Sequence, residues 1–118
     1  MTIQVKHLST WDLRGKLTDE LQKLHFTASA FGKVDAVKAL LDAGYYKDAA
    51  EIENGFGLED AFRLTQNLDQ SWLKNDGVHP VPALLEQGGA RSTCVGDIMI
   101  DDKGVTWVVA MAGFTQLD

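Results

Sequence analysis

The chain has 118 residues, 45% of them hydrophobic, and 17 acidic against 11 basic side chains give a net charge of −6. This length predicts one domain, 1–118, with a substantial core. The absence of an apolar run of about 18 residues predicts that no segment spans a membrane. The acidity disfavours binding to nucleic acid and to anionic membrane surfaces, because both repel a chain whose few cations are not gathered on one face.

The sequence contains a single cysteine, Cys94. An intrachain disulfide is therefore impossible, and a cysteine-based zinc site is not expected. His79 has no second histidine at metal-ligand spacing, so we expect neither a metal nor another cofactor. The free thiol, and the lack of a secretory signal at the start of the sequence, fit a cytoplasmic location.

The first part of the chain is predicted to form a strand and then a short helix. Apolar and polar residues alternate over Ile3–Leu8, as in a half-buried strand. Thr18 is a suitable N-cap, and the two acids that follow it favour the start of a helix. We expect this helix to end near His25, and the segment 26–31 to be a strand or an irregular connection.

A helix and a strand follow. Residues 34–43 carry apolar side chains at helical spacing, and Gly44 stands where a C-terminal cap belongs. The segment 45–53 has mixed propensity, but two aromatic residues followed by apolar–polar alternation favour a strand. Asn54 and Gly55 are then expected to turn the chain.

The strongest helical pattern covers residues 58–72, where one face repeats at the spacing of an amphipathic helix. The positions on this face are Leu58, Ala61, Phe62, Leu64, Thr65, Leu68 and Trp72. Residues 74–87 are predicted to be a loop, with room for a turn of helix at 83–86. Pro80 and Pro82 prevent longer regular structure there.

The C-terminal part of the chain is predicted to form a β-hairpin. Residues 98–100 are one strand, and a turn at 101–104 ends on a glycine. Residues 105–111 combine β-branched and aromatic side chains, which favours a second strand. Apolar residues on both of its faces predict cover on both sides. Gly113 and Phe114 are expected to break or bulge this strand.

Together these elements predict an α+β fold. It consists of a small, mainly antiparallel sheet that includes the C-terminal β-hairpin, with two or three helices packed on it. Two of these helices are expected at about 33–43 and 58–72. The patterns determine neither the strand order nor the oligomeric state.

Flexible backbone and polar side chains are densest in residues 88–97, directly before the hairpin. Two glycines precede a polar run there, and the polar members are Arg91, Ser92, Thr93, Cys94 and Asp97. One interpretation is a structural turn, in which the hydroxyls and Asp97 bond nearby backbone groups. The other is an anion- or nucleotide-binding loop with Arg91 as its charge. The stretch matches neither a Walker A motif nor a dinucleotide-binding fingerprint.

Three segments carry a further pattern: residues 58–72 (LEDAFRLTQNLDQSW), 89–97 (GARSTCVGD) and 112–114 (AGF). They resemble small uncharacterised proteins of bacterial mobile elements and phages. In those proteins an AFxLTN-x-D-x-x-W helix precedes an RS-x-SVGD strand, and a Gly-Phe pair closes the chain. Here Gln66 separates the Thr and Asn of the pattern, and Cys94 replaces a serine. The resemblance covers about the second half of the chain and implies no established activity or cofactor.

The first functional hypothesis is a small, acidic, non-catalytic interaction protein, encoded by a phage or plasmid, that binds a protein partner. Its contact residues would be Arg91, Ser92, Thr93, Asp97 and Trp72. An exposed aromatic beside an arginine is the usual composition of an interface hot spot. Trp72 has an alternative interpretation as a residue that caps the core at the end of its helix.

Two alternatives come from other classes of protein. One is a single-stranded nucleic-acid or nucleotide-binding module, in which Arg91 supplies charge and Trp107 a stacking ring. The net charge disfavours it. The other is a hydrolase that uses Ser92 or Cys94 as nucleophile, with Asp97 and a histidine in support. The sequence has no Gly-x-Ser-x-Gly nucleophile elbow, and we expect a protein without catalytic activity.

Overall fold

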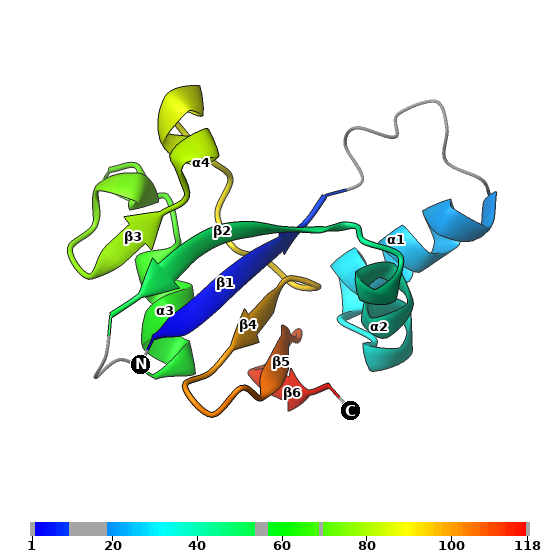
Figure 1. The fold of residues 1–118 in the computed structure, drawn as a ribbon. Coiled ribbons are helices and arrows are strands. Elements are labelled where there is room, and N and C mark those ends of the chain that lie inside the picture. Colours follow the sequence, from blue (N-terminus) through cyan, green and yellow to red (C-terminus); the bar gives the residue numbers. More distant parts are fainter. Residues whose placement is uncertain (1, 10–18, 54–56, 69, 118) are drawn as a thin grey trace.

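A computed structural model describes residues 2–9, 19–53, 57–68 and 70–117. These residues form a six-stranded antiparallel sheet and four α-helices, which confirms the predicted α+β fold (Figure 1). The strand order is β3-β2-β1-β4-β5-β6. The elements are β1 (Ile3–Leu8), α1 (Asp19–Phe31), α2 (Val34–Asp42), β2 (Tyr46–Ile52), α3 (Leu58–Leu64), β3 (Val78–Pro80), α4 (Pro82–Gln87), β4 (Ile98–Ile100), β5 (Thr106–Val109) and β6 (Phe114–Gln116).

Strand β1, which the sequence predicts correctly, lies at the centre of the sheet. It pairs with β2 on one side and with β4 on the other, both antiparallel. The pairing with β2 is interrupted by a bulge between Val5 and Lys6. Because β1 is central, its last residues meet the loop that leads into β4, and this is where the candidate site is built.

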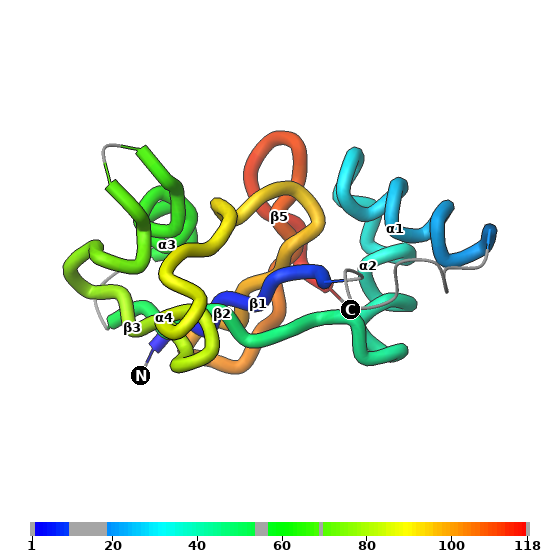
Figure 2. Tube along the Cα trace, turned by 90° about the horizontal axis from the view of Figure 1, so that it is seen from above, coloured from blue at the N-terminus to red at the C-terminus, as the bar shows by residue number. Residues whose placement is uncertain are grey.

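The buried apolar residues form two hydrophobic clusters. Met99 of β4 belongs to one cluster and its neighbour Ile98 to the other, as expected because adjacent strand residues point to opposite faces. Val109 and Val108 of β5 are separated in the same way. The first cluster includes α3 and Trp72, and the second includes α1 and α2. Helix α3 stands at one end of the sheet and α1 and α2 at the other, with the β5–β6 turn between them (Figure 2).

Helix α1 corrects the sequence prediction, because it continues past His25 to Phe31. Ala28 in this later part is completely buried in the cluster shared with α2. Tertiary packing therefore overrides a local composition that favours a strand. The helix ends at Gly32, whose φ of 63° lies in the left-handed region. The predicted N-cap, Thr18, lies outside the described residues.

The next two elements match the sequence analysis. The helix predicted at 34–43 is α2, and Gly44 follows it with a left-handed φ of 88°. The strand predicted at 45–53 is β2. The turn predicted at Asn54 and Gly55 falls on residues that the structure does not describe.

Helix α3 corrects a second prediction, because it ends at Leu64 and does not reach Trp72. The hydroxyl of Thr65 donates to the carbonyl groups of Ala61 and Phe62, and the amide of Gln66 also donates to that of Phe62. Side-chain donors thus bond the last carbonyl groups of the helix in place of backbone N–H groups. The helix can therefore end at this point. Trp72 begins a separate short 3₁₀ turn, Trp72–Lys74.

The region 74–87 is more regular than the predicted loop. Strand β3 adds to the edge of the sheet beside β2, and Pro80 is tolerated there because an edge strand has a side without ladder hydrogen bonds. The predicted turn of helix at 83–86 is confirmed within α4, which begins with Pro82 and ends at Gly88 with a left-handed φ of 79°.

The predicted hairpin forms from β4 and β5, and β6 extends it. In its turn, the carboxylate of Asp101 accepts hydrogen bonds from the Lys103 and Val105 N–H groups and, at 2.9 Å, from the indole N–H of Trp107. Strand β5 ends at Val109, two residues earlier than predicted. Within the described ranges, no helix is long and apolar enough to cross a membrane.

Candidate functional site

The predicted site lies in the loop 88–97, between α4 and β4. Its central contact is a two-bond ion pair between the guanidinium of Arg91 and the carboxylate of Asp97. The Nη1–Oδ2 distance is 2.7 Å and the Nη2–Oδ1 distance is 2.8 Å. Nη2 also donates to the Leu8 carbonyl at 3.0 Å. This geometry is the strong, bidentate form of an arginine–carboxylate contact, and it ties the loop to the end of β1.

Asp97 is completely buried, with a relative exposure of 0%. Besides Arg91, it accepts hydrogen bonds from the Leu8 N–H at Oδ1 and the Cys94 N–H at Oδ2, both at 2.8 Å. Each carboxylate oxygen therefore has two donors. Burial alone would lower the pKa of Arg91, but the hydrogen bonds and charge of Asp97 outweigh it and raise that pKa. The guanidinium of Arg91 therefore stays charged at neutral pH.

The two hydroxyl groups of the loop form hydrogen bonds with other groups of the same chain. Ser92 Oγ accepts a hydrogen bond from the Asn67 N–H at 2.8 Å. Thr93 Oγ1 lies 2.9 Å from Nε2 of His7, and the Thr93 side chain is buried. The expectation that Thr93 and Asp97 form part of an exposed contact surface is therefore wrong. Arg91 and Ser92 keep some exposed surface, and their role as contact residues stays a prediction.

Trp72 is completely buried. Its indole N–H donates to the Arg91 carbonyl at 2.8 Å, and its ring meets that of His7 edge-on at a centroid distance of 6.1 Å. The interpretation of Trp72 as an exposed aromatic anchor is wrong. Its interpretation as a core residue is confirmed, but not its place at the end of the helix, which stops at Leu64. Through its indole hydrogen bond, Trp72 fixes the backbone of the loop at Arg91.

His7 is a component of this cluster that the sequence analysis missed. It is buried, and burial lowers its pKa to about 4, although the charge of Asp97 acts in the opposite direction. The imidazole is therefore neutral at pH 7. One signal was available: the alternation of β1 puts His7 on the same face as Ile3 and Val5, both of which are in the core.

We predict a pH dependence from His7. Between pH 6.5 and about 4 the unfolded chain binds a proton at this imidazole that the folded chain does not, so acid favours unfolding. The full difference corresponds to about 3 kcal/mol, since each whole step in pKa is worth about 1.4 kcal/mol. Urea denaturation across this range should show the free energy of unfolding falling more steeply in wild type than in His7→Gln.

The exposed histidine of β3 provides the matched control for this prediction. His79 is exposed and bonds to Glu53 at 2.9 Å, so His79→Gln should keep the steep pH dependence of wild type. Parallel pH profiles for wild type and His7→Gln would show that the buried imidazole does not destabilise the protein in acid.

The hydrolytic alternative needs a histidine beside Ser92 or Cys94, but the described hydrogen bond of His7 is to Thr93, and both of these residues are buried. This contact disfavours the alternative, which stays a prediction. Burial raises the pKa of the Cys94 thiol, and the nearby Asp97 acts in the same direction, so the thiol is protonated at neutral pH. Within the described ranges, no group of three His, Cys, Asp or Glu side chains is placed to hold a metal ion.

The nucleic-acid alternative needs Arg91 as a charge and Trp107 as a stacking ring. Arg91 is paired with Asp97, and the indole of Trp107 is anchored to Asp101. These contacts disfavour the alternative, which stays a prediction.

The same loop contributes to an apolar groove between α3 and the β5–β6 turn. Its volume is about 320 Å³, at the small end of ligand pockets. We define the groove by its apolar lining, which is Phe62, Val95, Val109, Ala110, Met111 and Phe114. Met111 is 70% exposed at the tip of the turn, and Figure 2 shows that turn projecting between α3 and α1.

The end of α1 abuts this groove. A Cβ atom on Gly32 would lie 3.1 Å from the Ala110 Cα and 3.3 Å from the Val95 Cγ1. Gly96 of the loop also approaches α1 closely, because a Cβ there would lie 2.5 Å from the Ala28 carbonyl oxygen. Only a residue without a side chain allows these approaches. The loop thus packs directly against α1 at the wall of the groove.

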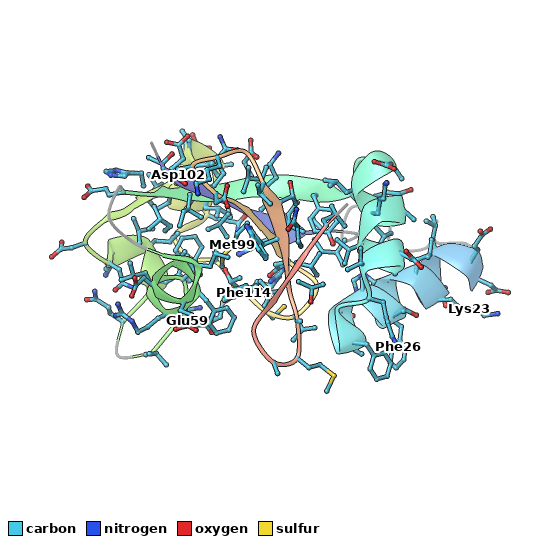
Figure 3. All side chains as sticks on the ribbon, turned by 90° about the horizontal axis from the view of Figure 1, so that it is seen from below. Lys23, Phe26, Glu59, Met99, Asp102 and Phe114 are labelled. Carbon is cyan, nitrogen blue, oxygen red and sulfur yellow. The ribbon has the colours of Figure 1, made fainter. Side chains whose placement is uncertain are left out.

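Two exposed aromatic side chains of α1 continue this apolar region. Phe26 and Phe31 are 61% and 47% exposed and stack edge-on with ring centroids 5.7 Å apart. In Figure 3, Phe26 lies on the same side of the molecule as Phe114 and Glu59. We call the groove together with Phe26 and Phe31 the apolar surface.

No protein-family model, curated protein sequence or solved structure matches this chain. The resemblance to proteins of mobile elements and phages therefore stays a prediction.

Proposed function

We propose that this chain is a small, acidic, non-catalytic interaction protein that binds a protein partner through the apolar surface. The observation that carries the proposal is the contiguity of exposed apolar side chains. Met111 follows Ala110 of the groove, Gly32 lies against Ala110 and Val95, and Phe31, which precedes Gly32, stacks on Phe26. Contiguous exposed apolar patches are uncommon on monomeric proteins and typically mark interaction sites.

The loop 88–97 has a different part in this proposal from the one expected from the sequence. Arg91 and Asp97 hold the loop by their ion pair, and Val95, which lies between them in sequence, lines the groove. The loop therefore supports the contact surface through an apolar side chain, while its charged side chains fix the backbone. Arg91 and Ser92 would add contacts only at the margin.

Photo-crosslinking in cells that encode the protein tests this function. A photoreactive phenylalanine analogue at position 111 should crosslink to one defined protein, whereas the same analogue at position 85 should not. Leu85 is the matched control, because it is 54% exposed but lies on α4, away from the apolar surface. The purified partner should bind Met111→Asp at least about tenfold more weakly, the size of an interface hot-spot effect. Equal crosslinking from both positions would contradict the proposal.

The cellular setting is part of the same proposal. The single cysteine is compatible with a reducing, cytoplasmic location, and the resemblance described above suggests a phage or plasmid gene. Neighbouring genes that encode mobile-element functions would support this origin, and a conserved housekeeping neighbourhood would oppose it.

A further inference from the structure

We infer that the segment of the partner that enters the groove carries a lysine or arginine next to its apolar side chains. This inference rests on the proposed function and names the chemistry of the partner. It depends on three observations: the charged residue at the groove, the hydrogen bonds of its neighbours, and the charge of the whole protein.

Glu59 is the one charged side chain among the described residues that line the groove. It is exposed, and Figure 3 shows it beside Phe114. The rest of the lining is apolar apart from Gly113. A ligand that fills the groove with apolar groups therefore meets one carboxylate at its edge.

The neighbouring acid of α3 is already engaged, whereas Glu59 is not. Asp60 accepts a hydrogen bond from the Gly57 N–H at 3.0 Å and contacts the Arg63 guanidinium at 3.3 Å. Within the described part of the chain, Glu59 takes part in no hydrogen bond or ion pair. Its charge is thus available to a partner, and a cation beside an apolar side chain would complement it.

The net charge of −6 also favours a basic segment of the partner. An acidic protein attracts basic segments over distances of about 8–10 Å at moderate salt and repels acidic ones. The groove supplies apolar contact area. Glu59 and the negative potential of the whole protein favour a positively charged segment over a negatively charged one. Charge complementarity of this kind contributes to specificity and to the association rate.

Two synthetic peptides of equal length test the inference. They share the same leucine and phenylalanine positions, and the remaining positions are lysine in one and glutamate in the other. Titration into isotopically labelled protein, followed by backbone amide chemical shifts, should show the lysine peptide binding more tightly. The shifts should centre on the groove residues, and added salt should weaken the binding.

Charge reversal at Glu59 gives the sharper result. Glu59→Lys should weaken the lysine peptide about fivefold or more, as expected for loss of an ion pair and gain of a repulsion, and should strengthen the glutamate peptide. Glu86→Lys on α4 changes the net charge equally but lies away from the groove. It should therefore have a smaller effect on both peptides.

The outcomes separate the inference from the function on which it rests. If both peptides bind the groove equally, or if Glu59→Lys and Glu86→Lys act alike, the basic partner is overturned and the protein-binding function stands. If neither peptide shifts the groove resonances, the inference is overturned, and the crosslinking experiment at position 111 decides the function independently. Self-association that Met111→Asp abolishes would make a second copy the occupant and would also overturn the inference.

Discussion

Replacing Asp97 by alanine should lower the free energy of unfolding by about 3 kcal/mol, as measured by urea denaturation. The carboxylate is completely buried and accepts hydrogen bonds from Arg91, Leu8 and Cys94. Removal of one partner from a buried ion pair typically costs 3–5 kcal/mol. We expect the lower end of this range, because 43% of the Arg91 side chain is exposed and can recover hydration.

Two further variants show whether the ion pair itself is responsible. The double variant Arg91→Leu/Asp97→Ala should lose less stability than the sum of the two single changes, because either change alone already breaks the pair. Asp102→Asn, an exposed acid in the β4–β5 turn, should change the stability by less than about 0.5 kcal/mol. Additive effects of Arg91→Leu and Asp97→Ala would mean that the two side chains stabilise the protein independently.

Replacing Trp72 by alanine should have an effect at least as large, about 4 kcal/mol in the free energy of unfolding. A large aromatic side chain removed from a closed core typically costs 3–5 kcal/mol, and Trp72 is 0% exposed. Trp72→Phe keeps most of the packing but loses the indole hydrogen bond to the Arg91 carbonyl. It should cost about 1–2 kcal/mol, because an unsatisfied carbonyl is left behind.

Leu68 is the informative control for Trp72. A continuous helix over 58–72 would bury both residues on one face, but in the structure Leu68 is 76% exposed. Leu68→Ala should therefore change the stability by less than about 0.5 kcal/mol. A loss of several kcal/mol would indicate that the helix continues beyond Leu64 and that Leu68 joins the core.

The candidate site was only partly predictable from the sequence. The glycine-rich polar stretch before the last hairpin does mark a place where distant segments meet, because Arg91 and Asp97 bond to β1. However, the same residue types are equally suited to an exposed binding loop and to a loop that is fixed by internal hydrogen bonds. The difference depends on which backbone groups surround them, and Leu8 is 83 residues away from Arg91 in sequence.

No single segment of the sequence predicted the groove. Its lining comes from α3, from the loop before β4 and from the β5–β6 turn, and each of these segments taken alone is an ordinary mixture of apolar residues. The exposure of Phe26 was hidden for another reason. The segment that contains it was expected to be a strand or an irregular connection, and the packing of Ala28 on α2 extends α1 and turns Phe26 outward.

The sequence by itself determined the fold class, the positions of β1, α2, β2 and the C-terminal hairpin, and the acidic charge. These follow from local periodicity, glycine placement and composition, which act over a few neighbouring residues. The tertiary structure alone decided where α1 and α3 end, that Trp72 and His7 are internal, and that Arg91 closes on Asp97. Those outcomes depend on side chains and backbone groups that lie far apart in the chain. These groups compete for the same hydrogen bonds and the same buried space only once the sheet has brought them together.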